Sequence, residues 1–185
     1  MDKQTDNTKF IIQRYDNYIS GANVKGNFLL AFNTFLTGGV IANYSKMVEL
    51  ITDNCGATLL NIALCCLIIS SIVTTVFVIN AVYPYLISGN SSKDNYHSHI
   101  FFNSVSEFES DKAYHDSLSK LNDNEFERDL SHQAFQLANG LKSKYNNLKW
   151  AMRFVYFELF CIFSIILITS LSTKNYLTFF EIIEI

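Results

Sequence analysis

Polar side chains that can bind an anion recur at helical spacing near the start of the sequence. Arg14, Tyr18 and Lys25 are spaced so that they share one face of a helix. Gln133 and Lys144 lie on a second segment with helical periodicity, together with Asn139, Lys142 and Lys149. If two such helices meet, these groups form a small cationic niche that suits one phosphate and one base. Alternatively, the cations are solvated and only anchor the chain beside a membrane.

Other residues with reactive side chains do not form a recognisable catalytic or metal site. The sequence has no GxSxG, HExxH, P-loop or GxGxxG motif. His97, His99 and His115 can be imagined as metal ligands, but histidines in a polar linker are more often solvated. Ser131 and His132 lie near Asp129, yet adjacent helix positions point apart. We therefore expect no catalytic residues, no metal and no cofactor.

Glu158 is an acidic residue inside an apolar segment. A carboxylate there is costly in hydrocarbon unless it is paired, protonated or close to the interface. Its expected partners are Arg153 or a polar group on a neighbouring helix. The other interpretation is an interfacial glutamate that extends its side chain toward water.

The composition indicates a membrane protein. The chain has 185 residues, of which 49% are hydrophobic and 17% are charged, and a typical soluble domain has roughly 25% charged residues. The charge-free segments are Gly26–Ser45, Cys55–Ser92 and Leu159–Thr173. The net charge of -3 argues against nucleic-acid binding, which requires a dense basic face.

These segments predict an all-α membrane protein with three transmembrane helices and a helical cytoplasmic region between the second and third. The expected spans are 27–44, 57–87 and 150–172, since a bilayer needs about 20 residues of helix. The first span is the least apolar, and a buried soluble helix or an uncleaved signal anchor is an alternative for it. Its stretch of Thr37, Gly38 and Gly39 is the best candidate for close helix contact.

The distribution of cations sets the expected orientation. Twelve of the 14 Lys and Arg residues lie before the first span or between Lys93 and Arg153, which favours a cytoplasmic N-terminus. The cytoplasmic parts are then an N-terminal helix over 1–26 and a helical region over 88–149. The external parts are a loop over 45–56 and a tail over 173–185.

The cytoplasmic region carries clear helix signals. One helix is expected around Lys112–Leu121, and Asn122 with Glu125 forms a capping box for another. Downstream of this cap, apolar residues recur about every 3.7 residues, which predicts one helix from about Asp123 into the third span. The residues of this stripe are Phe126, Leu130, Ala134, Leu137, Leu141, Tyr145, Leu148 and Met152. The segment Thr8–Lys25 similarly predicts a helix that continues into the first span.

Two segments resemble motifs of the PycTM family of Pycsar effectors. The first is QRYDNYISGANVKGNFLLAFNTFL, in which Arg14, Asp16, Tyr18, Ala22 and Lys25 match. The second is DLSHQAFQLANGLKSKYNNLKWA, in which Asp129, Gln133, Lys144 and Tyr145 match. The segment IFFNSVSEF resembles the aromatic patch that family members carry between these motifs. With the three spans, the resemblance covers most of the chain.

The resemblance implies a bacterial antiphage effector of the inner membrane. Such an effector responds to cyclic CMP or cyclic UMP from a cognate cyclase and impairs the membrane, which causes abortive infection. The expected partners are this nucleotide, membrane lipids and further copies of the chain. The candidate ligand contacts are Arg14, Tyr18, Lys25, Gln133 and Lys144. The alternatives are a ligand-independent membrane toxin or scaffold subunit, an effector of a related nucleotide-signalling system, and an intramembrane enzyme that uses Glu158.

Overall fold

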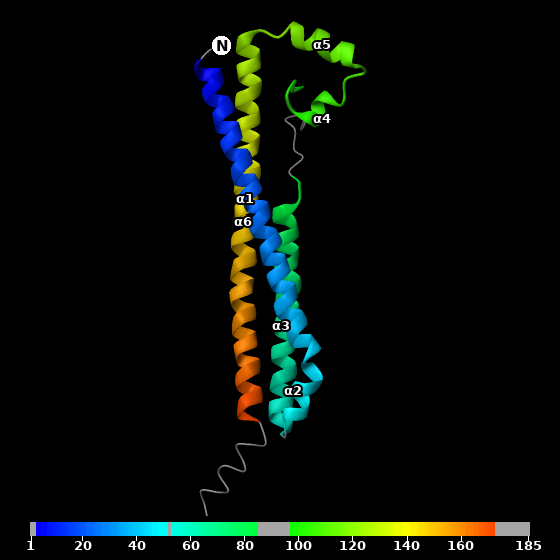
Figure 1. Cartoon of the computed structure of the whole chain (residues 1–185), viewed down its shortest axis with the longest axis vertical. Coiled ribbons are helices and arrows are strands. Elements are labelled where there is room, and N and C mark those ends of the chain that lie inside the picture. Colours follow the sequence, from blue (N-terminus) through cyan, green and yellow to red (C-terminus); the bar gives the residue numbers. More distant parts are fainter. Residues whose placement is uncertain (1–2, 52, 85–96, 173–185) are drawn as a thin grey trace, which may run out of the picture. The chain divides into compact units, whose positions relative to one another are not determined.

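A computed structural model describes residues 3–51, 53–84 and 97–172, and every regular element in these ranges is a helix (Figure 1). This confirms the all-α prediction for the described part of the chain. The elements in chain order are α1 (Lys3–Ala42), α2 (Tyr44–Leu50), α3 (Asn54–Val82), α4 (Phe102–Val105), α5 (Asp111–Ser119) and α6 (Asp123–Leu171).

The chain forms two compact units. The first consists of Met1–Val24 and Val82–Asn146, and we call it the polar unit. The second consists of Lys25–Ala81 and Asn147–Ile185, and we call it the apolar unit. Helices α1 and α6 each contribute residues to both units, as the continuous N-terminal and C-terminal helices of the sequence prediction require.

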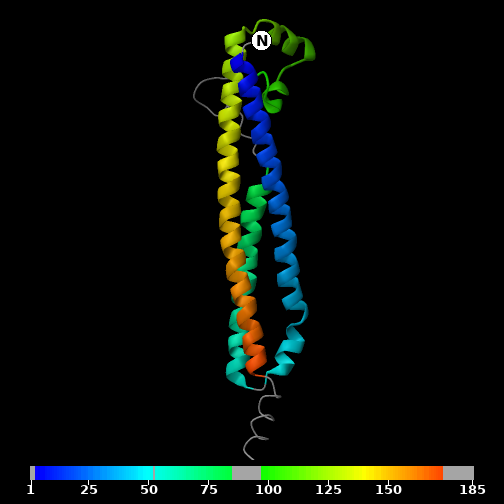
Figure 2. The same cartoon turned by 60° about the vertical axis from the view of Figure 1, so that its left-hand side comes forward.

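The apolar unit is a bundle of α3 with the second part of α1 and the second part of α6 (Figures 1 and 2). Its core contains Val40 of α1, Leu60 and Leu67 of α3, and Cys161 and Ile165 of α6. Large apolar side chains also cover the outside of the bundle, for example Phe28, Phe35, Ile62, Ile69 and Phe163. A bundle that is apolar on its outer faces suits a lipid environment.

Two helices are long and apolar enough to cross a membrane, namely α3 and α6. They cover residues 57–82 of the second expected span and residues 150–171 of the third. In the described residues α1 does not meet the same criterion, so the first span at 27–44 stays a prediction. Its polar residues Asn33, Thr34 and Thr37 explain the lower hydropathy of this segment.

The end of α3 differs from the expected end of the second span at Ile87. The helix stops at Val82, and Pro84 follows two residues later. Proline has no N–H to donate, and it disfavours helical geometry in the preceding residue, here Tyr83. Residues 85–87 lie outside the described part of the chain.

The expected close contact at Thr37, Gly38 and Gly39 is only partly correct. Thr37 is buried, but a side chain built on Gly38 or Gly39 would meet open space. Each helical residue turns about 100°, so the buried face of α1 passes through Asn33, Thr37 and Val40 and leaves both glycines on the outside.

The polar unit contains the first part of α1, the short helices α4 and α5, and the first part of α6. Lys9 of α1 lies over the ring of Phe126 on α6, 5.8 Å from its centroid. The helix expected at Lys112–Leu121 is α5, which begins after Ser110, whose hydroxyl accepts a hydrogen bond from the N–H of Ala113.

The buried face of α6 departs from the predicted apolar stripe. Leu130 and Leu148 are buried as predicted, but Tyr145 and Met152 are each 40% exposed. The buried positions near them are Gln133, Gly140, Lys144 and Ala151. With the half-buried Leu137 between Gln133 and Gly140, the positions from Leu130 to Ala151 recur about every 3.5 residues, as in a coiled-coil seam, and polar side chains occupy two of them. Apolar periodicity alone therefore identifies only part of the buried face and misses its polar positions.

The capping box at the start of α6 is confirmed. Asn122 Oδ1 accepts a hydrogen bond from the N–H of Glu125 at 2.9 Å, and Glu125 Oε2 accepts one from the N–H of Asn122 at 3.1 Å. We expect N122A to destabilise the first turn of α6 by about 1 kcal/mol. Amide hydrogen exchange of residues 123–126 is the measurement, with N122D as the control that keeps the cap. Unchanged exchange in N122A would contradict the prediction.

Candidate functional site

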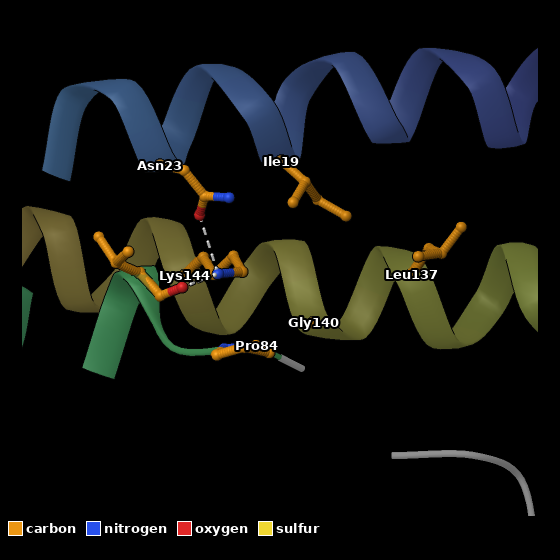
Figure 3. Close-up of a pocket in the computed structure, with 7 residues that line it drawn as sticks. Ile19, Asn23, Pro84, Leu137, Gly140 and Lys144 are labelled. Atoms are coloured by element: carbon orange, nitrogen blue, oxygen red, sulfur yellow. Dashed lines mark hydrogen bonds between the residues drawn. The ribbon is translucent and has the colours of Figure 1, made fainter. Parts of the chain in front are cut away.

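Lys144 lies in the interior of the polar unit and is only 4% exposed. Figure 3 shows its side chain beside Asn23 of α1. Its ammonium donates hydrogen bonds to Asn23 Oδ1 of α1 at 3.1 Å, to the carbonyl of Val82 at 3.2 Å and to the carbonyl of Tyr83 at 3.0 Å. One cation thus joins three segments of the chain, and these three acceptors are all neutral oxygens.

The lysine borders a cavity of about 270 Å³. Its lining residues come from α1, from α6 and from the end of α3 with the chain after it (Figure 3): Ile19, Asn23, Val82, Pro84, Leu137, Gly140 and Lys144. The cavity is close to the lower end of small-molecule sites, which are roughly 300–1,000 Å³. Apolar walls with a few polar groups are typical of such sites.

The surroundings of Lys144 have two opposing electrostatic effects. Burial lowers the pKa of the Lys144 ammonium from its ordinary value, because desolvation penalises the charged form. The carbonyls at the C-terminal end of α3 carry partial negative charge, which favours a cation. An anion that entered the cavity would stabilise the ammonium further.

The other predicted ligand contacts are distributed over separate places. Arg14 Nε donates to Tyr18 Oη at 2.9 Å, and its guanidinium lies 5.6 Å from the centroid of the Tyr18 ring, so these two exposed residues pair on the surface of α1. Gln133 is buried and donates to Ser98 Oγ at 3.0 Å. Lys25 belongs to the apolar unit. Arg14, Gln133 and Lys144 therefore have different hydrogen-bond partners and do not share one set of contacts.

Ser98 is the centre of a second buried polar cluster in this unit. Its hydroxyl donates to Asp129 Oδ1 at 2.8 Å and accepts hydrogen bonds from Gln133 and from the N–H groups of Ile100 and Phe101. Asp129 Oδ2 accepts the N–H of His99 at 2.8 Å. Asp129 and Gln133 thus attach the segment before α4 to α6.

The histidines of this segment take part in packing. His97 lies edge-on to Phe108, with ring centroids 4.8 Å apart. His99 Nε2 hydrogen-bonds with Ser117 Oγ, and the main-chain carbonyl of His99 accepts the hydroxyl of Tyr114. In the described ranges no group of three or more His, Cys, Asp or Glu residues could hold a metal ion.

Sequence reasoning missed Asn23 and Ser98. Asn23 lies inside the first PycTM-like segment but is not one of its matching residues, and Ser98 lies outside both segments. The role of each residue emerges only from contacts with residues far away in the chain. Their hydrogen-bond partners Asp129, Gln133 and Lys144 are residues that match the second PycTM-like segment, so the resemblance pointed to one side of these contacts.

Glu158 is fully buried in the apolar unit. Its Oε1 accepts a hydrogen bond from the hydroxyl of Thr74 on α3. The interfacial interpretation and the pairing with Arg153 are therefore wrong, since Arg153 lies over the ring of Trp150 at 4.4 Å. The expected polar partner on a neighbouring helix is confirmed as Thr74.

The fold and site together define a class of protein. It is a helical protein with two helices suited to a membrane and a separate polar helical unit that contains a lysine-lined cavity. The chain belongs to the PycTM family, since the family model, described as a Pycsar effector protein domain, matches residues 7–171. The predicted resemblance is thus confirmed.

Membership in this family makes the chain an antiphage defence effector. Pycsar effectors respond to cyclic nucleotide signals, and the family is not known for enzymatic activity. The comparison with curated proteins and the comparison with solved structures gave no match.

Proposed function

We propose that the chain binds cyclic CMP or cyclic UMP in the cavity beside Lys144 and then impairs the bacterial inner membrane, which causes abortive infection. The observation that supports this proposal is the buried Lys144 ammonium, which borders a small cavity and donates to neutral oxygens. The nucleotide comes from a cognate cyclase, and the active form is a homo-oligomer in contact with membrane lipids.

The phosphate of such a nucleotide competes with the neutral acceptors of Lys144. An anionic phosphate oxygen attracts the ammonium more strongly than a neutral carbonyl oxygen does, because two opposite charges then interact in a partly desolvated site. A phosphate in the cavity therefore draws Lys144 away from the carbonyls of Val82 and Tyr83, which frees the C-terminal end of α3. A ligand shifts the protein only by its difference in affinity for the two states, and here that difference arises at Lys144.

The remaining predicted contacts have different places in this proposal. Arg14 and Tyr18 offer an exposed cation and an aromatic ring at which a nucleotide can be attracted. Gln133 holds Ser98 and so positions the segment before α4. Lys25, which belongs to the apolar unit, remains a predicted contact.

The proposed topology is a multi-pass inner-membrane protein with a cytoplasmic N-terminus. Residues 1–26 and 88–149 are cytoplasmic, 27–44, 57–87 and 150–172 are the spans, and 45–56 with 173–185 are external. The apolar outer faces of α3 and α6 support two of these spans.

The test is dye leakage from liposomes that contain the full chain. We expect leakage after cyclic CMP or cyclic UMP and none after cyclic AMP, whose purine is larger. Leakage of equal rate without any nucleotide would favour a ligand-independent toxin. A membrane that stays intact with both pyrimidine nucleotides would contradict the proposal.

A further inference from the structure

Three polar side chains of the apolar unit lie buried on the inward faces of α3 and α6. Ser70, Thr74 and Glu158 are at most 3% exposed. The exposed positions of the same two helices are mainly large apolar residues, namely Ile62, Ile69, Ile72, Val76, Ile79, Phe160, Phe163 and Ile166. The polar groups therefore have no access to lipid, and they become available only if α3 and α6 separate.

The polar contacts between these helices leave the carboxyl group of Glu158 incompletely satisfied. Ser70 Oγ donates to the carbonyl of Phe154 at 3.3 Å, and Thr74 donates to Glu158 Oε1 one turn further along. No group within the described residues hydrogen-bonds to the buried Glu158 Oε2. Burial of a polar atom without a partner costs roughly 1–3 kcal/mol, so packing of this resting state does not explain a glutamate here.

Hydration of the interface between α3 and α6 would satisfy the same residues. Water would supply the missing partners of Glu158 and would leave its carboxyl ionised, while the hydroxyls of Ser70 and Thr74 would lie along the same wetted surface. Ionisable residues within membrane segments commonly mark ion pathways. Rings of acidic side chains attract cations and repel anions.

We propose that Glu158 faces the ion path of the membrane-active state and gives this path a preference for cations. The proposal rests on the proposed function, because it requires a state in which the membrane is permeable. In a homo-oligomer each copy contributes one carboxylate at the same depth, so the carboxylates form a ring.

The test measures the reversal potential of the full chain in planar bilayers with a gradient of potassium chloride. Cyclic CMP and cyclic UMP are applied in turn to open the path. We expect the wild type to favour potassium over chloride severalfold. E158Q keeps the shape and the Thr74 hydrogen bond but removes the charge, so we expect it to lose nearly all preference for potassium over chloride. E158D keeps the charge and should retain this preference. Equal selectivity of E158Q and the wild type would overturn the proposal.

The variant T74V tests whether Glu158 sets the ion selectivity or only holds α3 and α6 together. It removes the hydrogen bond to Glu158 and keeps the carboxylate, so we expect easier opening with an unchanged preference for cations. Loss of the preference in T74V as well as in E158Q would mean that Glu158 only holds α3 and α6 together, which contradicts the proposal. If the wild type conducts ions without selectivity, this inference alone is overturned. If neither nucleotide induces a current, the proposed function is overturned together with this inference.

Discussion

We expect K144M to weaken the response of the membrane to the nucleotide. Methionine has a similar length but no charge, so it cannot pair with a phosphate, and it leaves Asn23 and the carbonyls of Val82 and Tyr83 without their donor. Hydrogen bonds to charged groups contribute about 1.5–3 kcal/mol. We therefore expect the affinity for the cyclic nucleotide to fall by about ten- to a hundredfold, as measured by titration calorimetry on the full chain in detergent.

Lys142 provides the matched control for this variant. It lies two residues away on the same helix, and its side chain is exposed. K142M removes the same charge from α6 and should bind the nucleotide as the wild type does. Circular dichroism checks that both variants keep their helix content. Wild-type affinity in K144M, or equal losses in both variants, would contradict a specific role of Lys144.

We expect D129A to weaken the attachment of residues 98–101 to α6. The two carboxylate oxygens accept hydrogen bonds from the hydroxyl of Ser98 and the N–H of His99. Loss of both bonds costs about 3 kcal/mol or more, since the acceptor is charged and both donors are left behind. We expect amide exchange in residues 98–101 to become about a hundredfold faster, as followed by mass spectrometry.

D129N and S131A are the controls for this release. Asparagine keeps one oxygen acceptor, so its effect should be intermediate. Ser131 is an exposed neighbour on the same helix, so S131A should exchange as the wild type does. If D129A exchanges at the wild-type rate, Asp129 does not attach this segment.

The sequence predicted the helices well because their signals are local. The capping box of Asn122 and Glu125 depends on four consecutive residues, and the structure contains both of its hydrogen bonds. The end of α3 is also local, since it follows from Pro84, although the sequence prediction extended the span beyond it. Long uncharged segments likewise identified α3 and the end of α6.

Contacts between distant residues were not predictable in the same way. The inward position of Lys144 depends on acceptors that are 61 to 121 residues away in the chain. The partner of Glu158 is 84 residues away, on α3. Helical periodicity assigns faces by hydrophobicity, so it placed Tyr145 inside and left out Gly140. The burial of a polar side chain depends on hydrogen-bond partners elsewhere in the chain, and helical periodicity carries no information about those partners.

The hydrogen bonds of Asn33 have a consequence for membrane insertion. Its side-chain amide donates to the carbonyl of Ser71 and the hydroxyl of Thr75, both on α3. In the three-span arrangement that we propose, the segment 27–44 emerges from the ribosome before these acceptors exist. Its own hydropathy is modest, and an unpartnered amide in hydrocarbon costs several kcal/mol. Stable integration of the first span then waits for synthesis of α3, so the two helices enter the bilayer as a pair.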